Sequence, residues 1–116
     1  MLPTSAFQIA HHYSKIQIET ASKAKAVYML HQRCLFFLRK AQDYSAESLR
    51  YRFKAQNILS QLQQSLKITD DVSRSLYFLY DYCYVCLDRN DPAALVNVLA
   101  ILGVLRDVFQ ILSRRP

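Results

Sequence analysis

The side chains best suited to chemistry in this 116-residue chain are its three cysteines and three histidines. Cys83 and Cys86 form a Cys-x-x-Cys pair, a spacing used by zinc sites and by redox-active thiols. A zinc site needs four ligands, however, and a redox pair lies at the N-terminal end of a helix, whereas this pair comes near the end of a helical pattern. We therefore interpret Cys83, Cys86 and the distant Cys34 as reduced core thiols that bind no metal.

The histidines and the remaining polar residues also lack the arrangement of a catalytic site. His11 and His12 are adjacent near the N-terminus, which is a weak signal for metal binding. His31 lies at the edge of an apolar stripe and is interpreted as a half-buried core histidine, not as a catalytic base. The sequence contains neither a glycine-rich phosphate loop nor a nucleophile elbow. It therefore predicts no enzyme, no catalytic residues and no cofactor.

The composition predicts an all-α fold in a single domain. Hydrophobic residues make up 52% of the chain, which is too many for a disordered protein, and one Gly and three Pro are too few for the turns of a β protein. The N-terminus has no secretory signal pattern, and no uninterrupted apolar stretch is expected to span a bilayer. We therefore expect a cytoplasmic protein with no membrane insertion.

The hydrophobic pattern divides the chain into an arm and a helical domain. Residues 1–19 are expected to form an irregular or partly helical arm, and residues 20–116 an antiparallel four-helix bundle. The start signals of the four helices are Thr20 or Ser22, Ser45, Asp70 or Asp71, and Asp91 followed by Pro92. The very short turn before Pro92 predicts that the last two helices are antiparallel neighbours. Arg52 and Gln56 on the second helix are assigned to its water-facing side.

The last two helices carry more apolar surface than a bundle can bury. On the third helix, the bundle face is expected to hold Leu76, Leu79, Tyr80, Cys83, Cys86 and Leu87. Each of the two helices then has a second apolar stripe, and exposed apolar surfaces of this kind mark partner sites that accept an amphipathic helix. The residues of the predicted groove are Phe78, Tyr82, Val85, Ile101, Val104 and Val108.

Other uses of this surface remain open at the level of the sequence. The N-terminal arm could cover it permanently, or an obligate homodimer could bury it. The formal net charge of +6 also admits a small basic helical domain that binds nucleic acid. The charges are scattered along the chain, which favours a solvated, mildly basic surface and no nucleic-acid partner.

Two stretches resemble the FliS-type flagellar export chaperones. Residues 13–30, YSKIQIETASKAKAVYML, resemble the family's arm tyrosine and the Thr-Ala-Ser start of its first long helix. Residues 76–109, LYFLYDYCYVCLDRNDPAALVNVLAILGVLRDVF, resemble its last two helices, with a Leu-Tyr-Asp-Tyr run, a short Asn-Asp turn and a closing Leu-Arg-Asp before an aromatic residue. The family usually has Pro where this chain has Lys23, so we identify a divergent member.

The resemblance implies a cytoplasmic chaperone of helical-bundle fold. Such a chaperone binds the disordered C-terminal segment of flagellin on an apolar surface, prevents premature polymerisation and keeps the client ready for export. Other flagellar export proteins are further candidate clients. The resemblance also implies that the arm, with Tyr13 at the position of the family's tyrosine and Ile16 beside it, lies over the client site until the client displaces it.

Overall fold

The computed structural model describes residues 21–114, and this part of the chain is a four-helix bundle without strands. Its elements are α2 (Ala21–Asp43), the short 3-10 helix η1 (Ser45–Glu47), α3 (Ser48–Ser65), α4 (Asp71–Cys86) and α5 (Pro92–Ser113). The predicted all-α fold with four helices is confirmed. The predicted arm at residues 1–19 lies outside the described residues.

Local side-chain chemistry explains where α4 and α5 begin. The Asp70 carboxylate accepts a hydrogen bond from the Ser73 amide at 2.8 Å, and the Ser73 hydroxyl accepts one from the Asp70 amide at 3.3 Å, which completes a capping box. Asp91 accepts from the Ala93 amide at 3.0 Å, directly before Pro92 at the first helical position. Both predicted starts are confirmed.

The start of α3 differs from the prediction. Ser45 was expected to cap this helix, but it begins η1, and Glu47 occupies the N-cap of α3 without a side-chain capping bond. The three residues of η1 turn the chain from α2 into α3, so the helix starts two residues later than Ser45 as its cap would imply. The predicted caps of the first helix, Thr20 and Ser22, fall outside the side chains that the structure describes.

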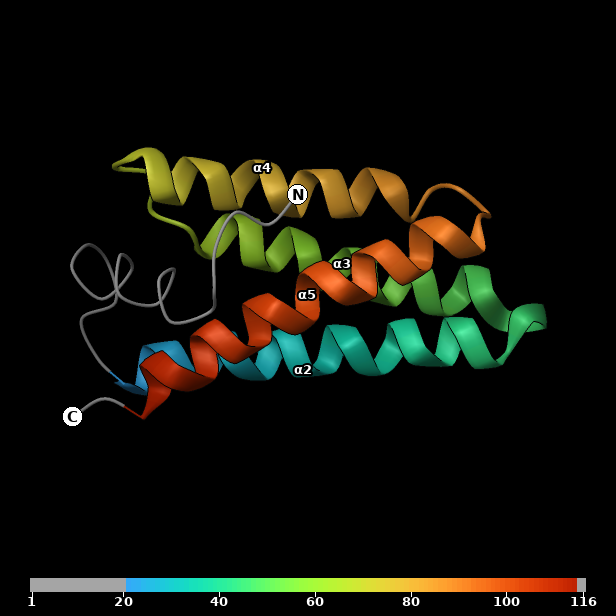
Figure 1. Cartoon of the computed structure of the whole chain (residues 1–116), viewed down its shortest axis with the longest axis horizontal. Helices are drawn as coiled ribbons and strands as arrows, with labels where there is room; N and C mark the ends of the chain where they lie inside the picture. The colour runs from blue at the N-terminus through green and yellow to red at the C-terminus, as the bar shows by residue number, and fades with distance from the viewer. Residues whose placement is uncertain (1–20, 115–116) are drawn as a thin grey trace.

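The helices pack in an order that places α5 mainly against α2. Helix α3 lies antiparallel between α2 and α4, while α5 runs obliquely from the end of α4 towards the beginning of α2 (Figure 1). Contacts between α4 and α5 are few, although a short turn joins them. The last two helices are thus antiparallel, as predicted, but they are neighbours mainly at their turn, because α5 packs on α2 along most of its length. The oblique path of α5 decides which of its residues are buried.

The composition of α5 requires one further correction. Within the described residues, Pro92–Ser113 is long and apolar enough to cross a membrane by length and composition, which the sequence-based expectation had excluded. One side of the helix instead belongs to the core of the bundle, with Leu95, Val98, Leu102, Leu105 and Phe109 buried. An apolar helix of this kind is common in protein cores.

Candidate functional site

The outer side of α4 presents an apolar stripe to solvent. Phe78, Tyr82 and Val85 are 61%, 48% and 48% exposed, and their i, i+4, i+7 spacing places them on one face. The opposite face of the same helix is buried at five positions and half-buried at Leu79, as predicted; the buried residues are Leu76, Tyr80, Cys83, Cys86 and Leu87. The predicted division of α4 into a core face and an exposed apolar stripe is confirmed.

The predicted matching stripe on α5 is not exposed. Ile101 is 7% exposed and Val108 is fully buried, so the expectation that they lie at the surface is wrong; Val104 between them is half-buried. Buried residues lie three or four positions from each of them: Val98 and Leu105 beside Ile101, and Leu105 and Leu112 beside Val108. The oblique packing of α5 on α2 widens the buried arc to include Ile101 and Val108. What remains on the surface is the α4 stripe, with Val104 as the α5 contribution.

A hydrogen bond joins the α4 stripe to α5. The Asn97 side-chain amide donates to the Tyr82 hydroxyl at 2.9 Å, and both groups are exposed. This contact connects the Tyr82 hydroxyl to α5, and the side chain stays 48% exposed. The half-exposed ring is therefore open to a bound peptide while its hydroxyl is bonded to α5.

The core beneath α4 contains a buried polar network at His31. Its Nδ1 lies 2.8 Å from the Val27 carbonyl, which can only accept, so Nδ1 carries the proton and Nε2 accepts from the Tyr80 hydroxyl at 2.9 Å. The imidazole stacks on the Phe109 ring with centroids 5.2 Å apart. Burial lowers the pKa of His31 from 6.5 to about 4, against the opposing effect of the Val27 hydrogen bond. His31 is therefore a neutral core residue that links α2, α4 and α5, more deeply buried than predicted.

The three cysteines are buried free thiols, as predicted. Burial, and then the nearby Cys86, raise the pKa of Cys83 to about 12, and burial likewise raises the pKa of Cys34. A thiol in this environment stays protonated and is a poor nucleophile and metal ligand. In the described part of the chain, no group of three His, Cys, Asp or Glu side chains is placed to hold a metal ion.

Comparison with known proteins connects this bundle to one family. The family described as flagellar protein FliS matches residues 6–115. This chain belongs to the FliS family. It is also similar to the flagellar secretion chaperone FliS of Bacillus subtilis (strain 168), with 29% identity over 107 residues that cover 84% of this chain and 80% of the relative.

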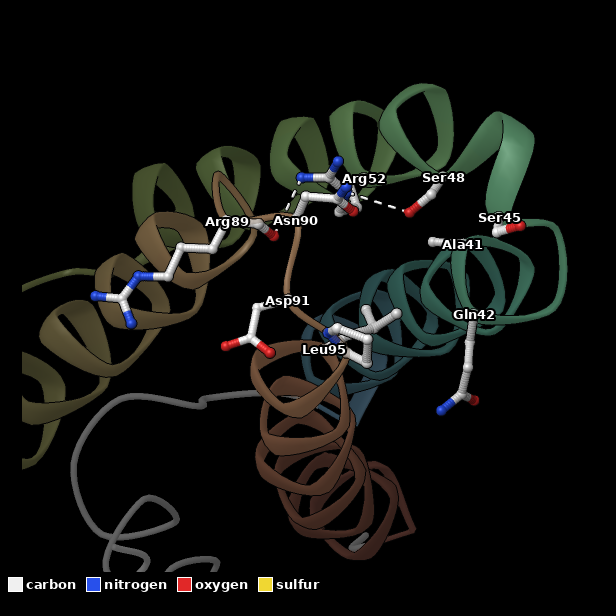
Figure 2. Close-up of a pocket in the computed structure, with 10 residues that line it drawn as sticks. Ala41, Gln42, Ser45, Ser48, Arg52, Arg89, Asn90, Asp91 and Leu95 are labelled. Atoms are coloured by element: carbon white, nitrogen blue, oxygen red, sulfur yellow. Dashed lines mark hydrogen bonds between the residues drawn. The ribbon is translucent and has the colours of Figure 1, made fainter.

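A pocket of about 210 Å³ opens at the end of this FliS-family bundle where two turns meet (Figure 2). It is lined by Ala41, Gln42, Ser45, Ser48, Arg52, Arg89, Asn90, Asp91, Pro92 and Leu95. Its buried cation, Arg52, donates to the Leu87 carbonyl at 2.6 Å and lies 3.3 Å from the Ser48 hydroxyl. Asp91 is the cap of α5. These charged groups stabilise the end of α4 and the start of α5, so the pocket is structural in character.

The burial of Arg52 and Gln56 corrects the prediction that they face water. They are 7% and 4% exposed, and Gln56 donates to the Tyr84 carbonyl at 3.0 Å and to the Asp88 carboxylate at 2.7 Å. Helix α4 ends without a glycine cap, so its last carbonyls need donors from elsewhere, and α3 supplies them. The missing C-terminal glycine was the signal in the sequence that could have revealed this role.

A second aromatic surface, with Phe36 and Tyr44 exposed and Phe37 and Tyr51 half-buried, was missed from the sequence. We call it the α2–α3 aromatic face; its rings are Phe36, Phe37, Tyr44 and Tyr51, and its cations are Arg33, Lys40, Arg50 and Lys54. Adjacent Phe36 and Phe37 point about 100° apart on a helix, so a one-sided apolar stripe cannot bury both. That pair was the available signal. The remaining predicted site residues, Tyr13 and Ile16, lie outside the described residues.

Proposed function

We propose that this FliS-family chain is a cytoplasmic flagellar export chaperone that binds the disordered C-terminal segment of flagellin on the exposed α4 stripe. Membership in the FliS family and the similarity to a flagellar secretion chaperone support the role in flagellar export. The single structural observation that supports the site is the exposure of Phe78, Tyr82 and Val85 in a row on a helix whose other face is already buried. Bound there, the client is held unpolymerised and ready for export.

The energetics of the α4 stripe suit an apolar peptide. A large apolar side chain contributes ~1.5–3 kcal/mol when it passes from full exposure to full burial, and these three side chains start about half exposed. A disordered client spends part of that free energy on becoming ordered as it binds. An amphipathic client helix laid along α4, with its apolar face on Phe78 and Val85, makes the best use of the stripe.

Val104 extends the proposed surface onto α5, whereas Ile101 and Val108 support it from inside the core. The contact between Tyr82 and Asn97 holds the two parts together. In this proposal, Tyr13 and Ile16 belong to a lid that occupies the stripe in the free chaperone and leaves when the client binds. Deleting the arm should then strengthen client binding.

The test is an isothermal calorimetric titration of the full chain with a peptide that spans the C-terminal segment of flagellin. Phe78→Asp should reduce affinity by at least tenfold, because an unpaired carboxylate would be buried against the client. Asn57→Asp is the matched control, since it adds the same charge at an exposed position of α3 away from the stripe. Both variants should keep the wild-type helical content by circular dichroism.

The outcomes separate the candidate functions. If Phe78→Asp binds the peptide as tightly as Asn57→Asp, the stripe is not the client site. An apolar contact should also change little with salt, whereas a nucleic-acid site would lose affinity steeply as salt rises. A wild-type chain that shows no affinity for the flagellin segment contradicts the proposed client itself.

A further inference from the structure

The first two long helices and the last two differ in charge. Residues 21–65, which form α2, η1 and α3, contain eight Lys or Arg and two acidic residues. Residues 71–113, which form α4, the following turn and α5, contain three Arg and five Asp. The positive charge of the described residues is therefore concentrated on α2 and α3, and of these eight cations only Arg52 is buried.

On the α2–α3 aromatic face, the cations rest on aromatic rings. Lys40 lies 5.4 Å from the centroid of Phe36 and 5.2 Å from that of Tyr44, and Lys54 lies 5.4 Å from that of Phe37. A cation over a ring is held in place but keeps its charge, because the ring contributes no formal negative charge. The face is thus a fixed positive array.

Two further cations complete this array. Arg33 lies 5.5 Å from the centroid of Phe37, and Arg50 lies 5.7 Å from that of Tyr51. Among the described residues, the one ion pair at this face joins Arg50 and Glu47 at 4.0 Å. Both side chains are exposed, so the pair neutralises little of the positive charge. The face therefore keeps an excess of positive charge that a partner can use.

Large apolar side chains lie beside these cations. Met29, Phe36 and Tyr44 are all more than half exposed, and Met29 and Phe36 are seven residues apart and so share one side of α2. Exposed aromatic and apolar groups flanked by Lys and Arg are typical of surfaces that lie in the headgroup region of an anionic membrane. Long basic side chains reach the phosphates while their stems and the rings sit at the edge of the acyl region.

We propose that the α2–α3 aromatic face docks this chain peripherally on an anionic membrane surface. This inference goes beyond the proposed client binding and uses side chains of α2, η1's neighbour Tyr44 and α3 in place of the α4 stripe. A nucleic acid fits less well, because single-stranded bases need free ring faces for stacking, and the cations already occupy faces of these rings. Helices α2 and α3 are adjacent and antiparallel, so side chains of both can contact one flat partner (Figure 1).

The test is co-sedimentation of the full chain with vesicles at low salt. Vesicles of equal parts phosphatidylcholine and phosphatidylglycerol should bind the chain, and pure phosphatidylcholine vesicles should not. The double variant Lys40→Gln/Lys54→Gln should lower the partition coefficient about 25-fold, since each basic residue near an anionic surface contributes roughly fivefold. Phe36→Ser should lower it several-fold at unchanged net charge.

The matched control is Lys67→Gln/Arg114→Gln, which removes the same charge at exposed positions away from the face. It should change binding less than twofold, and Phe78→Asp on the client stripe should do the same, so the two proposals fail independently. If the wild-type chain does not bind the anionic vesicles, or if both double variants lose binding equally, the proposal is overturned. It is also overturned if polyglutamate or duplex DNA binds through Lys40 and Lys54 while the vesicles do not.

Discussion

The spare apolar stripes of α4 and α5 have similar sequence patterns but different structural roles. Phe78, Tyr82 and Val85 on α4 stay about half exposed or more, whereas Ile101 and Val108 on α5 are buried in the core. The difference arises from the neighbours of each helix. Helix α4 packs mainly on α3, which covers one side, whereas α5 crosses α2 obliquely and is buried over a wider arc. Whether a second apolar stripe stays exposed therefore depends on how many neighbouring helices pack against its helix.

The largest effect that separates the two stripes is expected from Val108→Asp. An unpaired carboxylate in this buried position should lower the free energy of unfolding by about 4 kcal/mol or more, a large part of the stability of a small domain. Phe78→Asp on α4 should change it by less than about 0.5 kcal/mol, because the side chain stays in water. Urea denaturation followed by circular dichroism measures both.

Two results would contradict the expected stabilities of these variants. If Val108→Asp folds with wild-type stability, Val108 is at the surface and the predicted α5 stripe was right. If Phe78→Asp unfolds the chain, the outer side of α4 belongs to the core. Val108→Ala provides the apolar control and should cost less than Val108→Asp, since it creates a cavity without burying a charge.

A second effect, of about 3 kcal/mol, is expected from acid. The folded pKa of His31 is about 4, below its usual value of 6.5, so the unfolded chain binds more protons between these two pH values. The stability that this group contributes is complete above pH 6.5 and is lost as the pH falls towards 4, by ~3 kcal/mol in total. Urea midpoints measured across this range should show the loss.

His31→Gln is the control for this acid effect. It should be less stable than the wild type at neutral pH, because Tyr80 loses its imidazole partner, but its stability should depend less on pH between 6.5 and 4. If the wild type and His31→Gln lose stability in parallel, another group is responsible.

The sequence predicted features that depend on nearby residues. The capping residues Asp70 and Asp91 act within three positions of themselves, and the i, i+3, i+4 spacing on α4 assigned its inner and outer faces correctly. The family resemblance named the FliS family, which the comparison confirms. These features follow from local chemistry and helical periodicity, which a single sequence displays directly.

The features that the sequence did not predict depend on partners far along the chain. Arg52 is buried because carbonyls of Leu87 and Arg89, 35 and 37 residues away, need a donor. His31 is fully buried because Tyr80, 49 residues later, offers a hydroxyl to its free nitrogen. Long-range polar pairs of this kind turn nominally surface residues into core residues, and hydrophobic periodicity does not report them.

The smallest effect concerns two tyrosines that lie two residues apart on α4. Tyr80 is 1% exposed and donates to His31, while Tyr82 is 48% exposed and accepts from Asn97. Tyr80→Phe should cost about 1–2 kcal/mol, since it leaves the buried Nε2 of His31 without a donor. Tyr82→Phe should cost less than about 0.5 kcal/mol, because water replaces the lost partner of Asn97.

Binding separates the same pair in the opposite direction. Tyr82→Ala, which removes the ring from the proposed client stripe, should weaken binding of the flagellin peptide more than Tyr80→Phe does, although Tyr80→Phe removes a hydrogen bond from the core. Chemical denaturation and calorimetric titration of the same samples give both quantities. A larger binding defect in Tyr80→Phe would mean that client affinity depends on the packing of the core and not on contacts with the outer face of α4. The inner and outer faces of α4 would then not act independently.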